Sequence, residues 1–211
     1  MRIGVVSDTH DRHEAVAEAV RLLVEQQVEL ILHCGDIESP DTVRVFKGIP
    51  THFVFGNWDK DRGKLMAVIK EIGGTYYDSF GFLTLQEKRI AWVHSHERHQ
   101  LRQLENADYF DYVFYGHTHV REQHRTGRTL VANPGALFRA NPKTCIVLDV
   151  TTGEIKPIII PVKPATTPHA PTATLDEGTG SIILPPNALP SLPSSSRTLP
   201  TTDTSPPAPP G

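Results

Sequence analysis

The sequence contains little cysteine, no cluster of basic residues and no long apolar run. Its 211 residues include two cysteines, Cys34 and Cys145, which form no CxxC pair and lie in or beside apolar stretches, so we expect buried free thiols. No apolar run approaches the roughly 18 residues needed to cross a bilayer, and the opening residues MRIGVVSD predict a strand rather than a secretion signal. With a formal net charge of −3 and no lysine- or arginine-rich run, the chain gives no strong signal for a nucleic-acid or membrane partner. We therefore expect a cytoplasmic protein.

Aromatic residues are absent beyond Phe138, and proline becomes frequent instead. Of the 18 prolines, 14 lie at or after Pro157. A Pro/Ser/Thr-rich segment of this kind cannot bury enough apolar surface to offset the entropy that it loses on ordering. We therefore predict a folded domain over residues 1–162 and a disordered C-terminal tail over residues 163–211. The apolar segment SIILPP (181–186) is either a chance cluster or a docking motif for a protein partner or for the domain itself.

The apolar pattern of the first 162 residues alternates between strand and helix and then becomes mostly strand. Apolar periodicity and turn signals predict helices over residues 12–27, 40–47, 62–71 and 97–106. Strands are predicted over residues 2–7, 29–33, 51–55, 75–77, 80–86, 89–94, 111–115, 120–125, 128–132, 144–150 and 154–160. Asp11 is expected to cap the first helix, with Glu14 three residues later. This order predicts an α/β fold, a four-layer αββα sandwich of two mixed β-sheets flanked by helices.

Polar residues of the kind that bind metal ions follow five of the predicted strands. They lie in the motifs SDTH, HCGDIE, FGNWD, VHSH and YGHTH and are Asp8, His10, Asp36, Asn57, His94, His117 and His119. Each motif alone has an ordinary explanation as a turn or a surface group, but five in succession are hard to explain by packing. Side chains two residues apart in an extended segment share a face, so Asp8 and His10 are expected to bind one ion. The spacing is repeated by His117 and His119.

Asp36 has two carboxylate oxygens and is expected to bridge two ions. Histidine and carboxylate ligands without thiolate favour Mn, Fe, Zn, Co or Ni. The glycines at 35, 56 and 116, next to these ligands, are expected to let the backbone turn sharply. The sequence therefore predicts a binuclear metal centre at the strand ends.

The motifs also carry a family resemblance. Asp-x-His, Gly-Asp, Gly-Asn-x-Asp, a strand-terminal His and Gly-His-x-His, in this order, resemble the signature of the calcineurin-like metallophosphoesterases. The compact arrangement over about residues 1–160, with NPGALFRAN (133–141) after the last motif, resembles the small YfcE-type phosphodiesterase branch.

The resemblance implies two divalent transition-metal ions, Mn²⁺ first among them, with Fe, Ni, Co or Zn as alternatives. One ion would be held by Asp8, His10, Asp36 and His119, and the other by Asp36, Asn57, His94 and His117. The implied reaction is attack on phosphorus by a hydroxide that bridges the two ions. Asn57 would also contact a phosphate oxygen. His96 is a candidate catalytic and substrate-binding residue that donates to the phosphate or the leaving group, and a supporting or surface role is the alternative.

One position departs from the family pattern. Many members have Gly-Asn-His-Asp, in which the histidine protonates the leaving oxygen, whereas this chain has Trp58 at that position. An indole N–H cannot transfer a proton near neutral pH. Trp58 is therefore a candidate substrate-binding residue that stacks on an aromatic or nucleobase leaving group, or else a part of the pocket wall. Asp59 is left without a histidine to orient.

We therefore expect a metal-dependent phosphoric diester hydrolase acting on small phosphodiesters, with cyclic nucleotides among the candidates. A phosphomonoesterase or nuclease of the same fold is one alternative, although a nuclease is expected to show a basic groove. A non-catalytic metal-binding scaffold or adaptor, as in the retromer subunit of this fold, is another. The seven intact ligand positions argue against a scaffold, while the Pro-rich tail keeps a protein partner open. The sequence also leaves a homo-oligomer open.

Overall fold

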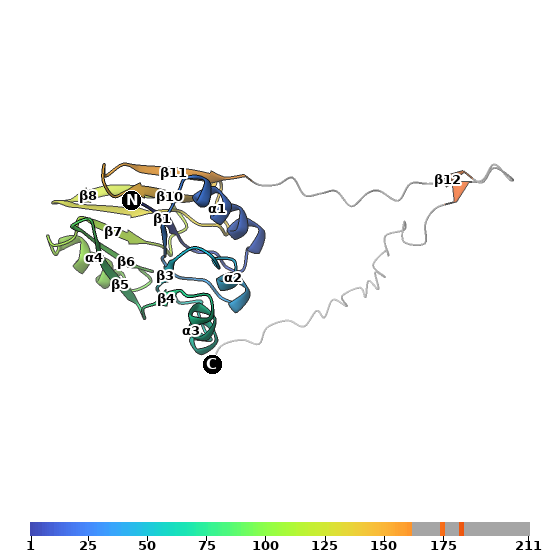
Figure 1. The fold of residues 1–211 in the computed structure, drawn as a ribbon, viewed down its shortest axis with the longest axis horizontal. Coiled ribbons are helices and arrows are strands. Elements are labelled where there is room, and N and C mark those ends of the chain that lie inside the picture. Colours follow the sequence, from blue (N-terminus) through green and yellow to red (C-terminus); the bar gives the residue numbers. More distant parts are fainter. Residues whose placement is uncertain (162–173, 176–181, 184–211) are drawn as a thin grey trace, which may run out of the picture. The chain divides into compact units, whose positions relative to one another are not determined.

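The computed structural model describes residues 1–161, 174–175 and 182–183 (Figure 1). The chain divides into a compact unit over Met1–Val162 and a second unit over Lys163–Gly211. The first unit contains two β-sheets and four helices, which are α1 (His13–Glu25), α2 (Pro40–Arg44), α3 (Arg62–Glu71) and α4 (Arg98–Asn106).

The first sheet has six strands. Their order is β11 (Ile155–Ile160), β10 (Lys143–Asp149), β1 (Arg2–Val6), β2 (Leu30–His33), β3 (Thr51–Phe53) and β4 (Thr75–Tyr76). Strands β1 to β4 are parallel, with Val6 opposite His33 and His33 opposite Phe53. The two strands β10 and β11 run antiparallel to their neighbours. Because these four strands are parallel, their carboxyl ends all lie at the same end of the sheet.

The second sheet has five strands. Their order is β5 (Phe80–Leu85), β6 (Lys88–Val93), β7 (Tyr112–Tyr115), β9 (Thr129–Asn133) and β8 (Glu122–Thr126). The central strands β6, β7 and β9 are parallel, and the edge strands β5 and β8 pair with them in antiparallel fashion. Both sheets are therefore mixed, as predicted.

Three apolar cores hold the layers together. Alternate residues of one strand point to opposite faces, so Ile90 and Trp92 of β6 enter the core between the two sheets, while Ala91 and Val93 enter a core shared with α4. In the same way Ile3 and Val5 of β1 pack between the sheets, and Val6 packs toward α1, α2 and α3. The order helix, sheet, sheet, helix confirms the four-layer sandwich.

The element bounds agree closely with the sequence pattern, apart from the start of α1. Asp11 is not its cap: Arg12 occupies that position without a side-chain hydrogen bond. The Asp11 backbone has φ +54°, and its carboxylate accepts hydrogen bonds from the hydroxyls of Ser39 and Thr42 at the start of α2. Asp11 therefore joins two loops instead of capping its own helix.

Both cysteines are free and buried, as expected, and burial raises the pKa of the Cys145 thiol to about 12. Within the described part of the chain, no helix has the length and apolar character needed to cross a membrane.

The second unit has a short antiparallel pair, in which β12 (Thr174–Leu175) lies against β13 (Ile182–Ile183) of the SIILPP segment. The disorder predicted for the rest of the tail lies outside the described residues.

Candidate metal centre

The seven predicted ligands lie in loops that follow parallel strands of both sheets. Asp8 and His10 follow β1, Asp36 follows β2, Asn57 follows β3, His94 follows β6, and His117 and His119 follow β7. Ligand sites of α/β proteins form beyond the carboxyl ends of parallel strands. The fold therefore collects these side chains from both halves of the chain into one place.

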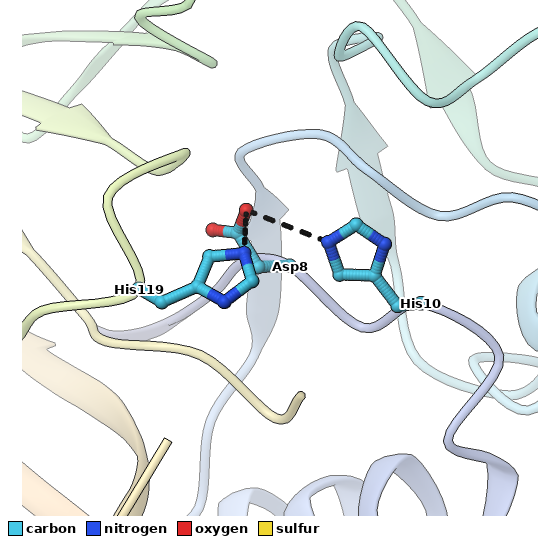
Figure 2. Close-up of side chains that lie close together, drawn as sticks. All are labelled: Asp8, His10 and His119. Carbon is cyan, nitrogen blue, oxygen red and sulfur yellow. Dashed lines mark ion pairs between the residues drawn. The ribbon is translucent and has the colours of Figure 1, made fainter. Parts of the chain in front are cut away.

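The first triad consists of Asp8, His10 and His119. One ligand atom from each lies within 4.8 Å of the others. Figure 2 shows the Asp8 carboxylate facing both imidazoles, with its Oδ1 at 3.2 Å from His119 Nε2 and 4.0 Å from His10 Nε2. Asp8 is fully buried, and its carboxylate also accepts the His117 backbone N–H. A buried carboxylate between two imidazoles is a donor set suited to a divalent cation.

The second triad consists of Asp36, His94 and His117, again with ligand atoms within 4.8 Å of one another. His94 Nε2 lies 3.1 Å from Asp36 Oδ2 and 3.1 Å from Asn57 Oδ1. His94 Nδ1 lies 2.8 Å from the Cys34 carbonyl oxygen, a partner to which it can only donate. In a neutral imidazole the Nε2 lone pair therefore faces two oxygen acceptors.

The same arrangement occurs at His10. Its Nδ1 lies 2.7 Å from Glu38 Oε1, so Nδ1 donates and Nε2 carries the lone pair. This Nε2 is buried, has no hydrogen-bond partner, and lies 3.5 Å from Asp36 Oδ2. Acceptors that converge without a hydrogen between them need a proton or a cation. The donor set therefore fits a metal ion on each side of Asp36.

Protonation of the triads follows the same electrostatics. Burial lowers the pKa of His94, but the hydrogen bond with Asp36 and the negative charges of Asp8 and Asp36 outweigh it, so the pKa is raised. The hydrogen bond with Asp8 likewise raises the pKa of His119. The carboxylates thus favour a positive charge at these imidazoles, as they would favour a metal ion, and metal binding competes with protonation.

The backbone of the ligand loops is not extended. Positive φ angles occur at Asp8 (+53°), His10 (+41°), Asp36 (+57°), His117 (+71°) and His119 (+59°). The expectation that Asp8 and His10 share a face of an extended segment is therefore wrong in its reason, although the two side chains do meet. Unlike Asp8 and His10, which share the first triad, His117 and His119 belong to different triads: His117 lies in the second and His119 in the first. Non-glycine residues in this region are strained and are held there by their surroundings.

The glycines beside the ligands have two different roles. Gly35 has φ +97°, as expected for a sharp turn. A Cβ at Gly56 would lie 2.1 Å from Asp36 Oδ1, and one at Gly116 would lie 1.9 Å from Ser7 Oγ. These two glycines are therefore required by close approach and not by their backbone angle.

Asp59 supports the site in a way that the sequence did not reveal. Its carboxylate accepts the backbone N–H groups of Asp36, Ile37, Glu38 and Gly56, at 2.7 to 3.0 Å. Burial raises the pKa of this carboxyl, and the N–H donors oppose that shift. Asp59 therefore holds the loop of Asp36 against the loop of Asn57.

His33 is a second supporting residue that was missed. Its Nδ1 accepts the Gly35 N–H at 3.1 Å, so its Nε2 donates to Thr9 Oγ1 at 3.2 Å. Thr9 in turn donates to the Asp36 carbonyl oxygen at 3.1 Å. Burial lowers the pKa of His33 to about 3, so the ring is neutral and keeps this tautomer. The only signal in the sequence was a histidine three residues before Asp36 in HCGD.

The three candidates for contact with substrate, His96, Asn57 and Trp58, lie beside the triads. The His96 ring centroid is 5.5 Å from that of His94 and 6.4 Å from that of His117, and its Nδ1 is buried without a hydrogen-bond partner. Burial lowers the pKa of His96. Asn57 is half-buried, next to His94. Trp58 is 56% exposed and meets the His10 ring edge-on at 6.2 Å.

Comparisons with known proteins point to one family. The calcineurin-like phosphoesterase superfamily domain matches residues 1–153. Phosphodiesterase MJ0936 of Methanocaldococcus jannaschii is 29% identical over 165 residues, which cover 76% of this chain and 99% of that protein. A probable metallophosphoesterase of Methanothermobacter thermautotrophicus is 32% identical over 144 residues, covering 64% of this chain and 77% of that protein.

Solved structures give the same result. A structure described as a novel archaeal phosphodiesterase has a TM-score of 0.71 and 29% identity, over 75% of this chain and 99% of that one. YfcE, a phosphoesterase from E. coli, shares the fold with a TM-score of 0.54 and 19% identity, over 76% of this chain and 100% of that one. As its motifs predicted, the chain belongs to the calcineurin-like phosphoesterase superfamily.

Proposed function

We propose that this chain is a phosphodiesterase that hydrolyses small phosphodiesters with two divalent metal ions, and that Mn²⁺ serves in both positions. The observation that carries the proposal is the position of Asp36 Oδ2, which lies 3.5 Å from His10 Nε2 and 3.1 Å from His94 Nε2. One carboxylate thus faces an imidazole lone pair from each triad. The relatives named as phosphodiesterases support the same activity.

The ligand assignment follows from the two triads. Asp8, His10 and His119 would hold one ion, His94, His117 and Asn57 the other, and Asp36 would contact both. Bound ions of this kind supply a water of lowered pKa and polarise the phosphoryl oxygens. Asp36 is kept in place by the backbone N–H of Trp58, which donates to its Oδ1 at 2.9 Å.

The protein groups around the triads favour a diester with a good leaving group. Trp58 occupies the position at which many family members carry an acid and offers no transferable proton. His96 has a free, buried Nδ1 near the second triad and is the candidate donor to the phosphate or the leaving oxygen. Asn57, beside His94, is placed to contact a phosphate oxygen.

Purified full-length protein, stripped of metal and reloaded with Mn²⁺, tests the proposal. We expect two ions per chain by elemental analysis and faster hydrolysis of bis(p-nitrophenyl) phosphate than of p-nitrophenyl phosphate. Faster monoester hydrolysis would make the protein a phosphomonoesterase. Two bound ions with no hydrolysis of either ester, or of a cyclic nucleotide, would favour the scaffold.

A further inference from the structure

Two aromatic rings border the first triad. The Phe138 ring centroid lies 4.7 Å from that of His10 and 6.0 Å from that of His119. Trp58 meets the same His10 ring at 6.2 Å. No ring other than a histidine contacts His94 or His117 within residues 1–161. The first triad is therefore the side of the centre that offers flat apolar surface.

Two arginine side chains stack on the Phe138 ring. The guanidinium carbon of Arg12 lies 4.7 Å from the Phe138 ring centroid, and that of Arg139 lies 4.8 Å from it. Both arginines are exposed. Arg139 follows Phe138 directly in the chain, whereas Arg12 comes from the distant loop before α1, so the fold brings Arg12 to the same ring. Arg139 is held at φ +46°, a strained angle for this residue.

Among the described residues, six arginines have no carboxylate within ion-pair distance, and of these six only Arg12 and Arg139 stack on an aromatic ring. Another six lie within ion-pair distance of a carboxylate, namely Arg2, Arg21, Arg44, Arg62, Arg89 and Arg128. Among the described residues, neither Arg12 nor Arg139 has such a partner. Stacking on a ring positions a guanidinium without neutralising it. Two unneutralised positive charges at one ring favour an anion on this side of the centre.

The ligand chemistry follows from the guanidinium geometry. A phosphate group offers several oxygens, and arginine binds such groups through paired, charge-assisted hydrogen bonds. The guanidinium groups contact the ring that contacts His10, so they lie one side chain away from the triad. They are thus placed for an anion next to the scissile phosphate and not for the scissile phosphate itself.

We propose that the substrate is a short nucleotide phosphodiester with a terminal phosphate, which is attracted by Arg12 and Arg139 beside Phe138 while a base stacks on Trp58. This inference rests on the proposed phosphodiesterase activity and names its substrate class. The exposed indole of Trp58, with Lys60 Nζ 6.0 Å from its ring, supplies the base-binding surface. A simple aryl diester would use the metal centre without using the arginines.

The kinetic experiment compares three substrates of the Mn²⁺-loaded protein, which are a dinucleotide with a 5′-terminal phosphate, the same dinucleotide without it, and bis(p-nitrophenyl) phosphate. We expect kcat/KM to be at least about tenfold higher for the phosphorylated dinucleotide, in line with charged hydrogen bonds. Arg12→Gln and Arg139→Gln should each remove most of this preference and leave the aryl diester unchanged. Arg125→Gln, the same charge loss at an exposed position near the β8–β9 turn, is the control.

A binding experiment removes the dependence on hydrolysis. Metal-free protein is titrated with a dinucleotide whose internal linkage is an uncleavable methylphosphonate, with and without the terminal phosphate. Trp58 reports binding by fluorescence quenching, because the second tryptophan, Trp92, is fully buried. Tighter binding of the phosphorylated form, lost in both arginine variants, is the expected result, and Trp58→Phe should abolish the signal.

Equal binding and equal hydrolysis of the two dinucleotides would overturn this inference. So would arginine variants that slow all three substrates by one factor, because that pattern assigns the arginines to the scissile phosphate. Hydrolysis of none of the diesters, with the binding preference intact, would instead overturn the proposed function and leave the phosphate-binding pair standing. Thermal midpoints close to wild type establish that the variants are folded, and Arg139→Lys should restore part of the preference.

Discussion

The two triads contain the same kinds of ligand but have different surroundings. Around Asp8, His10 and His119 lie the aromatic rings of Trp58 and Phe138. Around Asp36, His94 and His117 lie groups that can exchange hydrogen bonds or protons, namely the Asn57 amide and the His96 imidazole. Two triads with similar ligands can thus have different roles because different side chains surround them. We interpret the first side as the one that recognises substrate and the second as the one that handles protons.

Asp36 is the connection between the two sides, so its removal should have the largest effect. Asp36→Ala should abolish binding of both ions and lower hydrolysis of aryl diesters by roughly 10³-fold or more, since metal ions supply several kcal/mol of transition-state stabilisation. Elemental analysis and kcat/KM measure the two effects, with Asp41→Ala in α2, an exposed carboxylate, as the control. Two ions with activity intact would show that the sides do not depend on a shared carboxylate.

Asp59 holds the loop of Asp36 against the loop of Asn57, and its loss should lower stability. Asp59→Asn keeps one acceptor oxygen for four backbone N–H donors. Leaving buried donors unpaired should lower the free energy of unfolding by about 3 kcal/mol. Denaturant unfolding of the metal-free protein measures this change. Asp61→Asn, an exposed change at the start of α3, should cost much less. Equal losses would mean that the Asp59 hydrogen bonds are not special.

The dependence of the hydrolysis rate on leaving-group pKa tests whether the second side contains a proton donor. If nothing protonates the leaving oxygen, the rate should fall steeply as leaving-group pKa rises across a series of aryl diesters. Trp58→His should then accelerate hydrolysis of the diesters with the poorest leaving groups by only about tenfold, which is less than the 10²–10⁴-fold effect of a well-oriented acid. The reason is that the Asp59 carboxylate, which would orient the new imidazole, already accepts four backbone N–H groups. A flat dependence in the wild type, abolished by His96→Gln, would identify His96 as the donor.

Removal of the predicted tail should have the smallest effect. Truncation after Val162 should leave kcat and the thermal midpoint nearly unchanged, because the segment has no aromatic residue and few large apolar residues with which to form a core. Activity assays and calorimetry on the shortened chain check this expectation. A large loss of either would mean that the segment containing Ile182 and Ile183 binds the domain.

The parts of the molecule that sequence reasoning captured are those encoded locally. Helix α3 was predicted over its observed residues because Gly73-Gly74 ends it. The residues of the two triads were expected to meet because each of their motifs follows a strand. The missed features depend on partners far apart in the chain. Asp59 acts on Asp36, and Phe138 contacts His10, and no short motif records either contact. The wrong cap at Asp11 has the same origin, since its partners belong to α2.

Each triad takes ligands from both sheets. Asp8 and His10 follow a strand of the first sheet and His119 a strand of the second, while Asp36 follows the first and His94 and His117 the second. A metal ion in either position would therefore cross-link the two sheets at the carboxyl ends of their parallel strands. Sliding of one sheet over the other would pull both coordination shells apart. A substitution in the core between the sheets, for example at Trp92, should consequently change the affinity for metal. Conversely, bound metal should stabilise the packing of one sheet on the other.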